Sequence, residues 1–209
     1  MGLFGSKESK DQQRGGAGNR VSRHSSGWAA LLKELKQQEG LRVLDFGATS
    51  STNINFITAL GHSIYTVGLV QEAMDPKWTV QTALFDQPIF DTGPFLSENM
   101  DFGERRFDVV LLWDTLGYLP AHLTEPVLKK LFEVMEPGGR LLGFFPVKKE
   151  GEYGRFHLRE DDQVDMQKLP AQMLHCVLTS RQIENSFAAF AGYKFFLAKD
   201  NLREVLVTR

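Results

Sequence analysis

The sequence predicts an α/β domain with a doubly wound, mostly parallel sheet and an antiparallel strand near its C-terminus. Short apolar runs, typical of buried strands, alternate along the chain with segments in which apolar residues recur at helical spacing. The last two apolar runs, 193–198 and 204–208, are separated by the turn residues Asp200 and Asn201. This spacing predicts a terminal hairpin, which adds the antiparallel strand to the parallel sheet.

Seven runs are predicted to be strands. The clearest is 107–113, which is almost continuously apolar, as expected of a strand that helices cover on both faces. The other six are 41–47, 63–69, 78–85, 140–145, 193–198 and 204–208.

Helices are predicted between these strands, because apolar residues recur there every three or four positions. The first begins near Trp28 and stops before Gly40, a residue that commonly ends helices. The others are 54–60, closed by Gly61; 123–135, ended by the Pro137-Gly138-Gly139 turn; and 180–190, capped by Thr179 or Ser180.

Composition limits the classes of partner and compartment. The formal net charge of −2 gives no indication of nucleic acid as a partner. A single cysteine, Cys176, cannot form an internal disulfide, which fits a reducing compartment. No apolar run approaches the roughly 20 residues that span a bilayer, so we expect a cytoplasmic protein with no transmembrane segment.

Residues 1–27 differ in composition from the rest of the chain, which we expect to form one domain over 28–209. They are rich in Gly, Ser, Lys and Arg, and such a segment buries too little apolar surface to offset its chain entropy. We therefore predict a flexible, mildly basic tail. Two alternatives stay open: a peptide that docks on a protein partner, and an N-myristoylated anchor, since Gly2 and Ser6 fit that loose pattern.

Three stretches of the predicted domain, in order and at matching spacing, resemble class I S-adenosylmethionine-dependent methyltransferases of the small-molecule type. The first is Val43-Leu44-Asp45-Phe46-Gly47, and the second is the strand 107–113 with its loop to Leu119. The third is the segment 131–142, which includes the Pro-Gly-Gly turn. The resemblance covers roughly residues 40–209 and implies a Rossmann-like, seven-stranded sheet with S-adenosylmethionine as cofactor.

The resemblance implies that the loop after the first strand holds the cofactor. In the family this loop reads acid-x-Gly-x-Gly-x-Gly, and a glycine-rich loop lets the backbone approach a ligand closely. Asp45 and Gly47 match the pattern, whereas Thr49 and Ser51 stand where the second and third glycines belong. The acid that usually ends the second strand and binds the ribose is absent from 67–71.

Further site residues follow from the same resemblance. Asp86 is the best candidate for contact with the adenine, with Asp101 as a rival. Trp113 and Asp114 would line the methyl donor and the substrate side, and a core position is an equal alternative for Trp113. Tyr118 and His157 are expected on the substrate side. Methyl transfer needs mainly alignment, with a base only for a weakly nucleophilic acceptor, so no catalytic residue is assigned.

Two functions fit these observations. The first is an S-adenosylmethionine-dependent methyltransferase that acts on a small molecule or a protein side chain. The second is a non-catalytic methyltransferase-like interaction or scaffold protein that has lost cofactor binding, which the missing glycines and the missing ribose acid favour. A nicotinamide-dependent dehydrogenase is disfavoured because no G-x-G-x-x-G follows the first strand.

Overall fold

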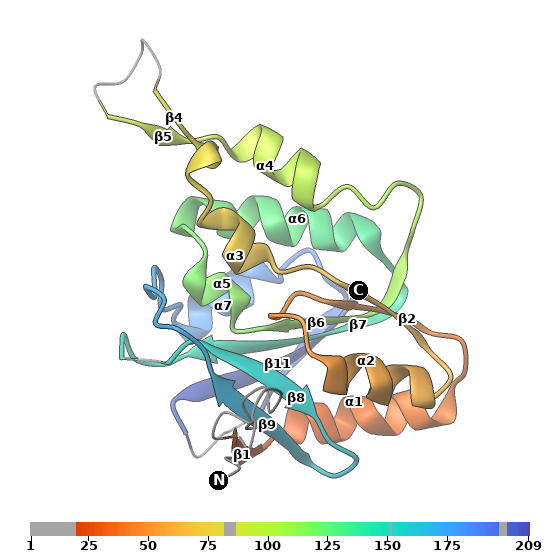
Figure 1. The fold of residues 1–209 in the computed structure, drawn as a ribbon. Helices are drawn as coiled ribbons and strands as arrows, with labels where there is room; N and C mark the ends of the chain where they lie inside the picture. The colour runs from red at the N-terminus through yellow and green to blue at the C-terminus, as the bar shows by residue number, and fades with distance from the viewer. Residues whose placement is uncertain (1–19, 82–86, 151, 197–199) are drawn as a thin grey trace, which may run out of the picture.

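The computed structural model describes residues 20–81, 87–150, 152–196 and 200–209. Within them, six strands form a central sheet in the order β10-β11-β7-β6-β2-β3 (Figure 1). Strands β3, β2, β6 and β7 pair in parallel, and β11 runs antiparallel to both β7 and β10. The predicted α/β class and its terminal hairpin are confirmed. The strand bounds are β2 Arg42–Asp45, β3 Ser63–Thr66, β6 Phe107–Trp113, β7 Met135–Pro146, β10 Gly192–Phe196 and β11 Leu202–Thr208.

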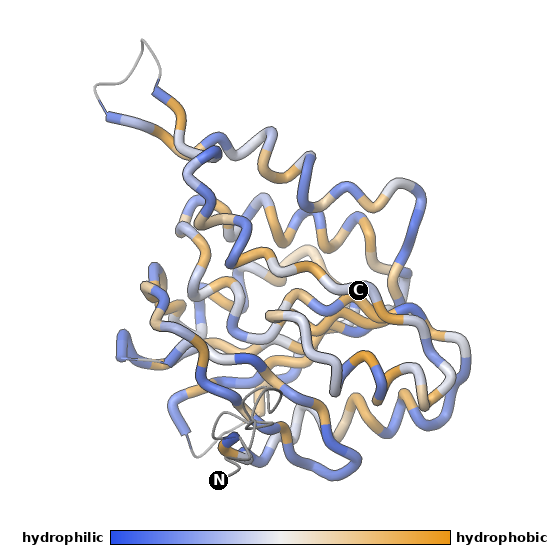
Figure 2. The backbone as a smooth tube through the Cα atoms, viewed as in Figure 1, coloured by the Kyte–Doolittle hydropathy of each residue, from blue (hydrophilic) through white to orange (hydrophobic). Residues whose placement is uncertain are grey.

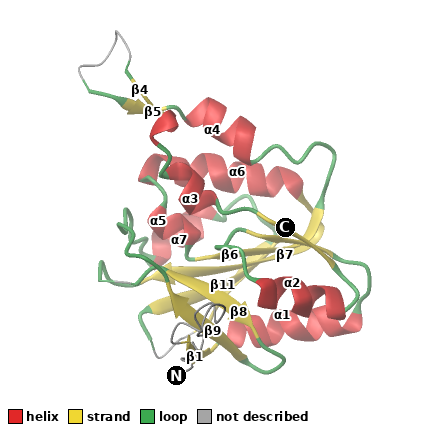
Figure 3. Ribbon diagram, viewed as in Figure 1, coloured by secondary structure: helices red, strands yellow, loops and turns green. Residues whose placement is uncertain are grey.

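Helices cover both faces of this sheet (Figures 1 and 3). Two lie on one face: α1 Ser26–Gln37 and α2 Ser51–Ala59. Five lie on the other: α3 Leu69–Ala73, α4 Thr92–Asn99, α5 Thr115–Tyr118, α6 Thr124–Val134 and α7 Ser180–Ser186. Two short 3₁₀ turns, η1 Pro76–Trp78 and η2 Ala121–Leu123, complete the helical elements. Among the described residues, no helix combines the length and apolar character needed to cross a bilayer.

The side chains of strand β6 enter the cores on both faces of the central sheet. Val110 and Leu112 point into the core beneath α5 and α6, whereas Val109, Leu111 and Trp113 join the core beneath α1 and α2. Successive side chains of a strand alternate between faces, so a continuous apolar run serves two cores. Figure 2 shows the resulting apolar stretches along the central strands.

A second, three-stranded sheet lies beside the carboxyl ends of the central strands (Figure 1). It is antiparallel, in the order β1-β9-β8, with β1 Arg20–His24, β8 Gly154–Leu158 and β9 Gln163–Lys168. Strands β8 and β9, which come from a highly charged part of the sequence, form a hairpin. Its inner positions Phe156, Leu158 and Val164 are buried in the core beneath α1 and α2, because its charged residues alternate with apolar ones.

The folded unit begins earlier than the predicted boundary after residue 27. Residues 20–24 pair with β9, and Ser25 caps α1 by accepting a hydrogen bond from the backbone N–H of Trp28. Glu204 of β11 holds this junction, since its carboxylate accepts from Ser25 Oγ at 3.0 Å and from Gly27 N at 2.8 Å. The tail proposed for partner binding and myristoylation falls largely on residues 1–19, outside the described residues.

The predicted strand 78–85 does not join the central sheet over its described part. Thr79–Val80 forms β4, which pairs only with β5, Ile89–Phe90, in a separate ladder. Trp78 anchors this hairpin through an edge-to-face contact with Phe95, 5.3 Å between ring centroids. Residues 82–86 lie outside the described residues, so the described sheet has six strands where seven were predicted.

Candidate functional site

Asp45, the last residue of β2, connects the loop after β2, helix α2 and the end of β6 through hydrogen bonds. It is buried, and three protein donors surround its carboxylate. Oδ1 accepts from Gly47 N at 2.9 Å and from the Trp113 indole N–H at 2.6 Å, while Oδ2 accepts from Asn53 Nδ2 at 3.0 Å. Burial raises the pKa of Asp45, and these three hydrogen bonds oppose the rise. The carboxylate is therefore committed to the protein itself.

Gly47 is required by the Trp113 indole. A Cβ atom at position 47 would lie 2.7 Å from Trp113 Cδ1 and 2.9 Å from Nε1, so only glycine leaves room for this ring. The indole stacks on Phe156 of β8, with 5.0 Å between centroids and an interplanar angle of 11°. Trp113 has a φ of 51°, a left-handed backbone that a large side chain rarely adopts. The second sheet thus holds Trp113 over the loop after β2.

The beginning of α2 is tied to β8. Ser50 caps the helix by accepting from Asn53 N, and its hydroxyl lies 2.8 Å from His157 Nδ1. His157 Nε2 lies 3.1 Å from Gln167 Oε1, and burial lowers the pKa of this histidine, so it is neutral at pH 7. Asn53 also accepts from the backbone N–H of Leu158. His157, expected beside a substrate, thus contacts the first turn of α2.

Thr49 and Ser51, the two replacements for family glycines, are exposed at the same helix start. Since Ser50 satisfies only Asn53 N, the backbone N–H groups of Ser51 and Thr52 have no partner among the described residues. The start of a helix with free N–H groups favours an anionic group. This turn can therefore receive a carboxylate from solvent.

The end of β3 offers no carboxylate for a ribose. Strand β3 stops at Thr66, and Leu69 and Val70 at the start of α3 are buried in the core. Val70 shares this core with Leu116 and Tyr118 of α5, so side chains fill the space between the two strand ends. Glu72, the nearest acid downstream, is exposed on α3. Asp86, expected at the adenine, lies outside the described residues.

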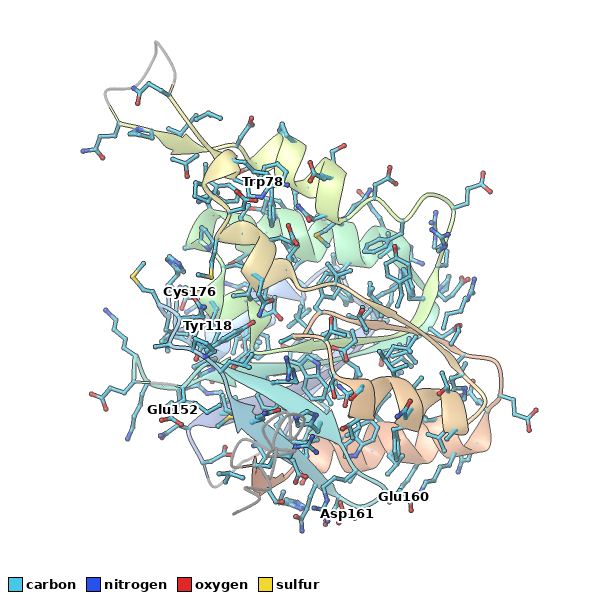
Figure 4. The ribbon with its side chains drawn as sticks, in the orientation of Figure 1. Trp78, Tyr118, Glu152, Glu160, Asp161 and Cys176 are labelled. Carbon is cyan, nitrogen blue, oxygen red and sulfur yellow. The ribbon has the colours of Figure 1, made fainter. Side chains whose placement is uncertain are left out.

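A cavity of about 580 Å³ opens between the central sheet and the second sheet, next to the carboxyl ends of β6 and β7. Asp114 and Tyr118 line it from the segment after β6, and Arg23 lines it from β1. Glu152 lines it from the loop after β7, and Figure 4 shows Glu152 and Tyr118 on the same side of the molecule. The structure therefore brings Asp114 and Tyr118 together, as predicted residues of one site, and adds Arg23.

Asp114 is the most perturbed ionisable group of this cavity. Only 4% of its surface is exposed, and burial raises its pKa to about 7, against a small opposing effect of the Arg23 charge. Burial, followed by the Asp114 charge, also raises the pKa of Tyr118, which keeps its proton. A carboxyl group that titrates near pH 7 can accept or release a proton under ordinary conditions. Among the described residues, no cluster of His, Cys, Asp and Glu is placed to hold a metal ion.

Arg23 is the functional candidate that the sequence did not indicate. It lies in a polar stretch with a single large apolar residue, Val21, and so was assigned to the tail. A usable signal existed at the other end of the chain, where Glu204 is followed directly by the apolar residues 205–207 of the last strand. A charge beside such a run needs a buried partner, and here that partner is Arg23, whose Nη2 lies 2.9 Å from Glu204 Oε1.

The raised pKa of Asp114 makes stability depend on pH. Between about pH 4 and pH 7 the folded protein keeps a proton on Asp114 that the unfolded chain has released, so stability falls as the pH rises through this window. Between pH 5 and pH 8 we expect the wild type to lose about 3 kcal/mol of unfolding free energy relative to Asp114→Asn, which does not titrate. Urea denaturation of both proteins at each pH measures this difference, and parallel pH profiles would contradict the assignment.

Comparison with known families agrees with this architecture. The family model described as "Methyltransferase domain" matches residues 21–192, most of the chain. The chain therefore belongs to the methyltransferase domain family, of the class I S-adenosylmethionine-dependent kind, as its sequence motifs predicted. Membership implies S-adenosylmethionine as the cofactor. No curated protein sequence matches the chain.

Solved structures similar to this chain include two methyltransferases and the protein TehB. One is the 1,6-didemethyltoxoflavin-N1-methyltransferase of Burkholderia thailandensis with S-adenosylhomocysteine bound (15% identity, 88% of this chain and 79% of that chain, TM-score 0.46). Another is the magnesium protoporphyrin IX methyltransferase of Synechocystis with S-adenosylmethionine bound (14%, 87% and 77%, 0.48). The third is TehB of Haemophilus influenzae (13%, 86% and 61%, 0.49). The assignment to the family rests on the family match alone.

The described residues fit one end of this cofactor, its methionine part. The unpaired N–H groups of Ser51 and Thr52 suit the carboxylate of its methionine part, and the half-buried backbone of Gly47 and Ala48 lies beside them. Asp45 is not available to the amino group, because three protein donors already occupy it. The described part of the site thus offers backbone donors to a carboxylate and no ribose carboxylate at the end of β3.

Proposed function

We propose that this protein is an S-adenosylmethionine-dependent methyltransferase that acts on a small molecule held in the cavity beside Asp114. The observation that carries the proposal is the placement of Asp114. It directly follows Trp113 at the end of β6 and lines a cavity whose volume falls within the range of small-molecule sites. Substrate and methyl donor would thus meet at the carboxyl end of β6, where the resemblance to the family places the methyl donor.

The chain's own residues supply binding and proton transfer. The first turn of α2 binds the carboxylate of the cofactor, and the cofactor supplies an electrophilic methyl group. A protonated acceptor must lose its proton before it can act as a nucleophile, and Asp114 accepts it because its pKa of about 7 lies near the working pH. Tyr118, which keeps its hydroxyl proton and lines the same cavity, orients the acceptor.

A second candidate function is a non-catalytic methyltransferase-like binding protein. The observation that favours it is the internal use of the motif residues: Trp113 occupies both the carboxylate of Asp45 and the open face of Gly47. Under this alternative, the loop after β2 is retained to hold Trp113 and the second sheet, and the cavity binds a ligand that is not methylated.

Calorimetric titration with S-adenosylhomocysteine distinguishes the two candidates. We expect saturable binding to the wild type and at least a tenfold loss in Ser51→Asp, which places a negative charge where the cofactor's carboxylate would lie. This variant should stay folded, because an acidic residue in the first turn of a helix is favourable.

Thr58→Asp, an exposed substitution near the other end of α2, is the matched control and should bind like the wild type. No heat at millimolar ligand with folded protein would refute methyl transfer and leave the second candidate. Unchanged affinity in Ser51→Asp would show that the cofactor does not use this helix start.

A further inference from the structure

Two residues that line the cavity, Arg23 and Tyr118, each carry a buried polar atom without a partner among the described residues. The Arg23 side chain is 9% exposed and Tyr118 is 3% exposed, and among the described residues neither Arg23 Nη1 nor the Tyr118 hydroxyl has a hydrogen-bond partner. An unpaired buried polar group costs about 1–3 kcal/mol. Because both residues belong to one cavity, a ligand that enters between them would satisfy both groups.

The remaining hydrogen-bonding capacity of Arg23 lies at Nη1, which carries two N–H groups. Its Nε lies 2.6 Å from Asp200 Oδ2, its Nη2 lies 2.9 Å from Glu204 Oε1, and its guanidinium stacks over the Phe144 ring. Two carboxylates thus already balance its charge, so Nη1 offers a directed N–H without a net positive field. Such a donor suits a neutral oxygen of a ligand, such as a hydroxyl or a carbonyl.

The charges around the cavity favour a cation. Among the described residues, four carboxylates line it and Arg23 is the one basic side chain: the carboxylates are Asp114, Glu150, Glu152 and Asp200. Asp200 pairs with Arg23 and Glu152 pairs with Lys168, but no side chain among the described residues donates a hydrogen bond to Asp114. A ligand ammonium group would give this carboxylate a charged N–H donor.

Apolar groups complete the wall between these polar positions. Val21 of β1, Met166 of β9, Pro146 of β7 and Leu202 of β11 all line the cavity. Tyr118 presents its ring in an edge-to-face pair with Tyr153, 4.9 Å between centroids. A hydrophobic body with a few convergent polar groups is the usual composition of a small-molecule site.

We propose that this cavity binds a small organic amine with an apolar body and a hydroxyl or carbonyl oxygen. Its ammonium lies against Asp114, its oxygen accepts from Arg23 Nη1 and meets the Tyr118 hydroxyl, and its apolar part packs against Met166 and Leu202. This inference names the substrate class of the proposed methyltransferase, which would then transfer a methyl group to the amine nitrogen. Binding of the amine itself does not require the cofactor.

A matched set of four probes tests each part of this proposal by calorimetry or NMR titration of the full chain without cofactor. The reference probe is 2-amino-1-phenylethanol. Phenethylamine lacks its hydroxyl, 1-phenylethanol lacks its amine, and mandelate replaces the aminomethyl group by a carboxylate. We expect the reference probe to bind most tightly, phenethylamine several-fold more weakly, and the other two at least tenfold more weakly.

Variants locate the binding. Asp114→Asn should weaken binding of 2-amino-1-phenylethanol at least tenfold at pH 8, and Tyr118→Phe should weaken it several-fold. Glu125→Gln, an exposed change at a separate cavity beside α6, is the control and should have no effect.

Preference for mandelate would overturn the proposal in favour of an anion on Arg23. Equal binding of 1-phenylethanol, unchanged affinity in Asp114→Asn, or no binding of any probe would also overturn it. None of these results depends on S-adenosylhomocysteine, so the cofactor titration tests methyl transfer separately.

Discussion

Replacing Asp45 with alanine should lower the free energy of unfolding by about 4 kcal/mol. The substitution leaves Gly47 N, Asn53 Nδ2 and the Trp113 indole N–H without their acceptor in a buried place. Each unsatisfied buried donor costs about 1–3 kcal/mol, although Asn53 keeps its other bond, to the Phe156 carbonyl. Urea denaturation, with the midpoint and the m-value fitted separately, measures the loss.

Thr49→Ala is the matched control, since Thr49 lies in the same loop and is exposed. It should change stability by less than about 0.5 kcal/mol. Asp45→Asn should fall between the two, because its Oδ1 can still accept from Trp113 while its amide group faces the Asn53 amide. If Asp45→Ala costs less than 1 kcal/mol, Asp45 is free for a ligand, and the internal role assigned to it is wrong.

This role changes how a binding defect at Asp45 should be interpreted. The sequence motif predicts that Asp45→Ala weakens cofactor binding through a lost contact. The structure instead places the carboxylate 1% exposed beneath the Trp113 indole, so the variant would disturb the loop and β8 together. Ser51→Asp tests the same loop without touching these buried contacts, which is why it is the better probe of the cofactor site.

Local patterns were sufficient to predict most of the central fold. The apolar run 107–113 gave a strand buried on both faces, and helical spacing from Trp28 gave α1, which begins at Ser26. Both predictions succeeded because the determinants lie within a few residues of each other. The strand predicted at 140–145 begins earlier, at Met135, and the Pro137-Gly138-Gly139 segment is an irregularity in its pairing with β6, where Gly138 has a φ of +79°.

The second sheet could not be predicted, because its pairing is non-local. Strand β1 pairs with β9 in the register Val21↔Met166, across most of the chain. The residues of β1 are mostly polar and show no alternation of apolar and polar positions that would indicate a strand. Its partner is a hairpin whose sequence is rich in charged residues. The same pairing places Arg23 at the cavity. Because the pairing was not predicted, residues 20–24 were assigned to the tail, and Arg23 was not named as a candidate site residue.

The candidate site likewise contains residues that local patterns could indicate and contacts that they could not. Asp114 and Tyr118 could be named as candidates because they follow a well-marked strand, and the structure places both at one cavity. Asp45 and Gly47 were identified by the motif, yet the partner that determines their environment is Trp113, 68 positions from Asp45. A motif records which residue types a loop tolerates, and it does not say whether a ligand or another side chain fills the space above them.

Replacing Glu204 with alanine should also be strongly destabilising, by about 3–5 kcal/mol, because it breaks a buried charge pair from one side. Glu204 is 1% exposed, and its carboxylate holds Ser25 Oγ, Gly27 N and Arg23 Nη2. These contacts join the last strand of the central sheet to the start of α1 and to β1. Losing them leaves the Arg23 guanidinium partly uncompensated in a place that excludes water.

Asp200→Ala is the matched control for this prediction, since Asp200 is the other carboxylate on Arg23 but is 42% exposed. An exposed ion pair contributes at most about 1 kcal/mol, so this variant should be close to the wild type in stability. Glu204→Gln should be intermediate, because its amide oxygen can still accept one of the three hydrogen bonds. Equal losses in Glu204→Ala and Asp200→Ala would show that surface charge, and not the buried junction, holds β1 on the domain. If the junction does hold it, Glu204→Ala should also abolish binding of 2-amino-1-phenylethanol in protein that is still folded at low temperature, since Arg23 reaches the cavity only while β1 is in place.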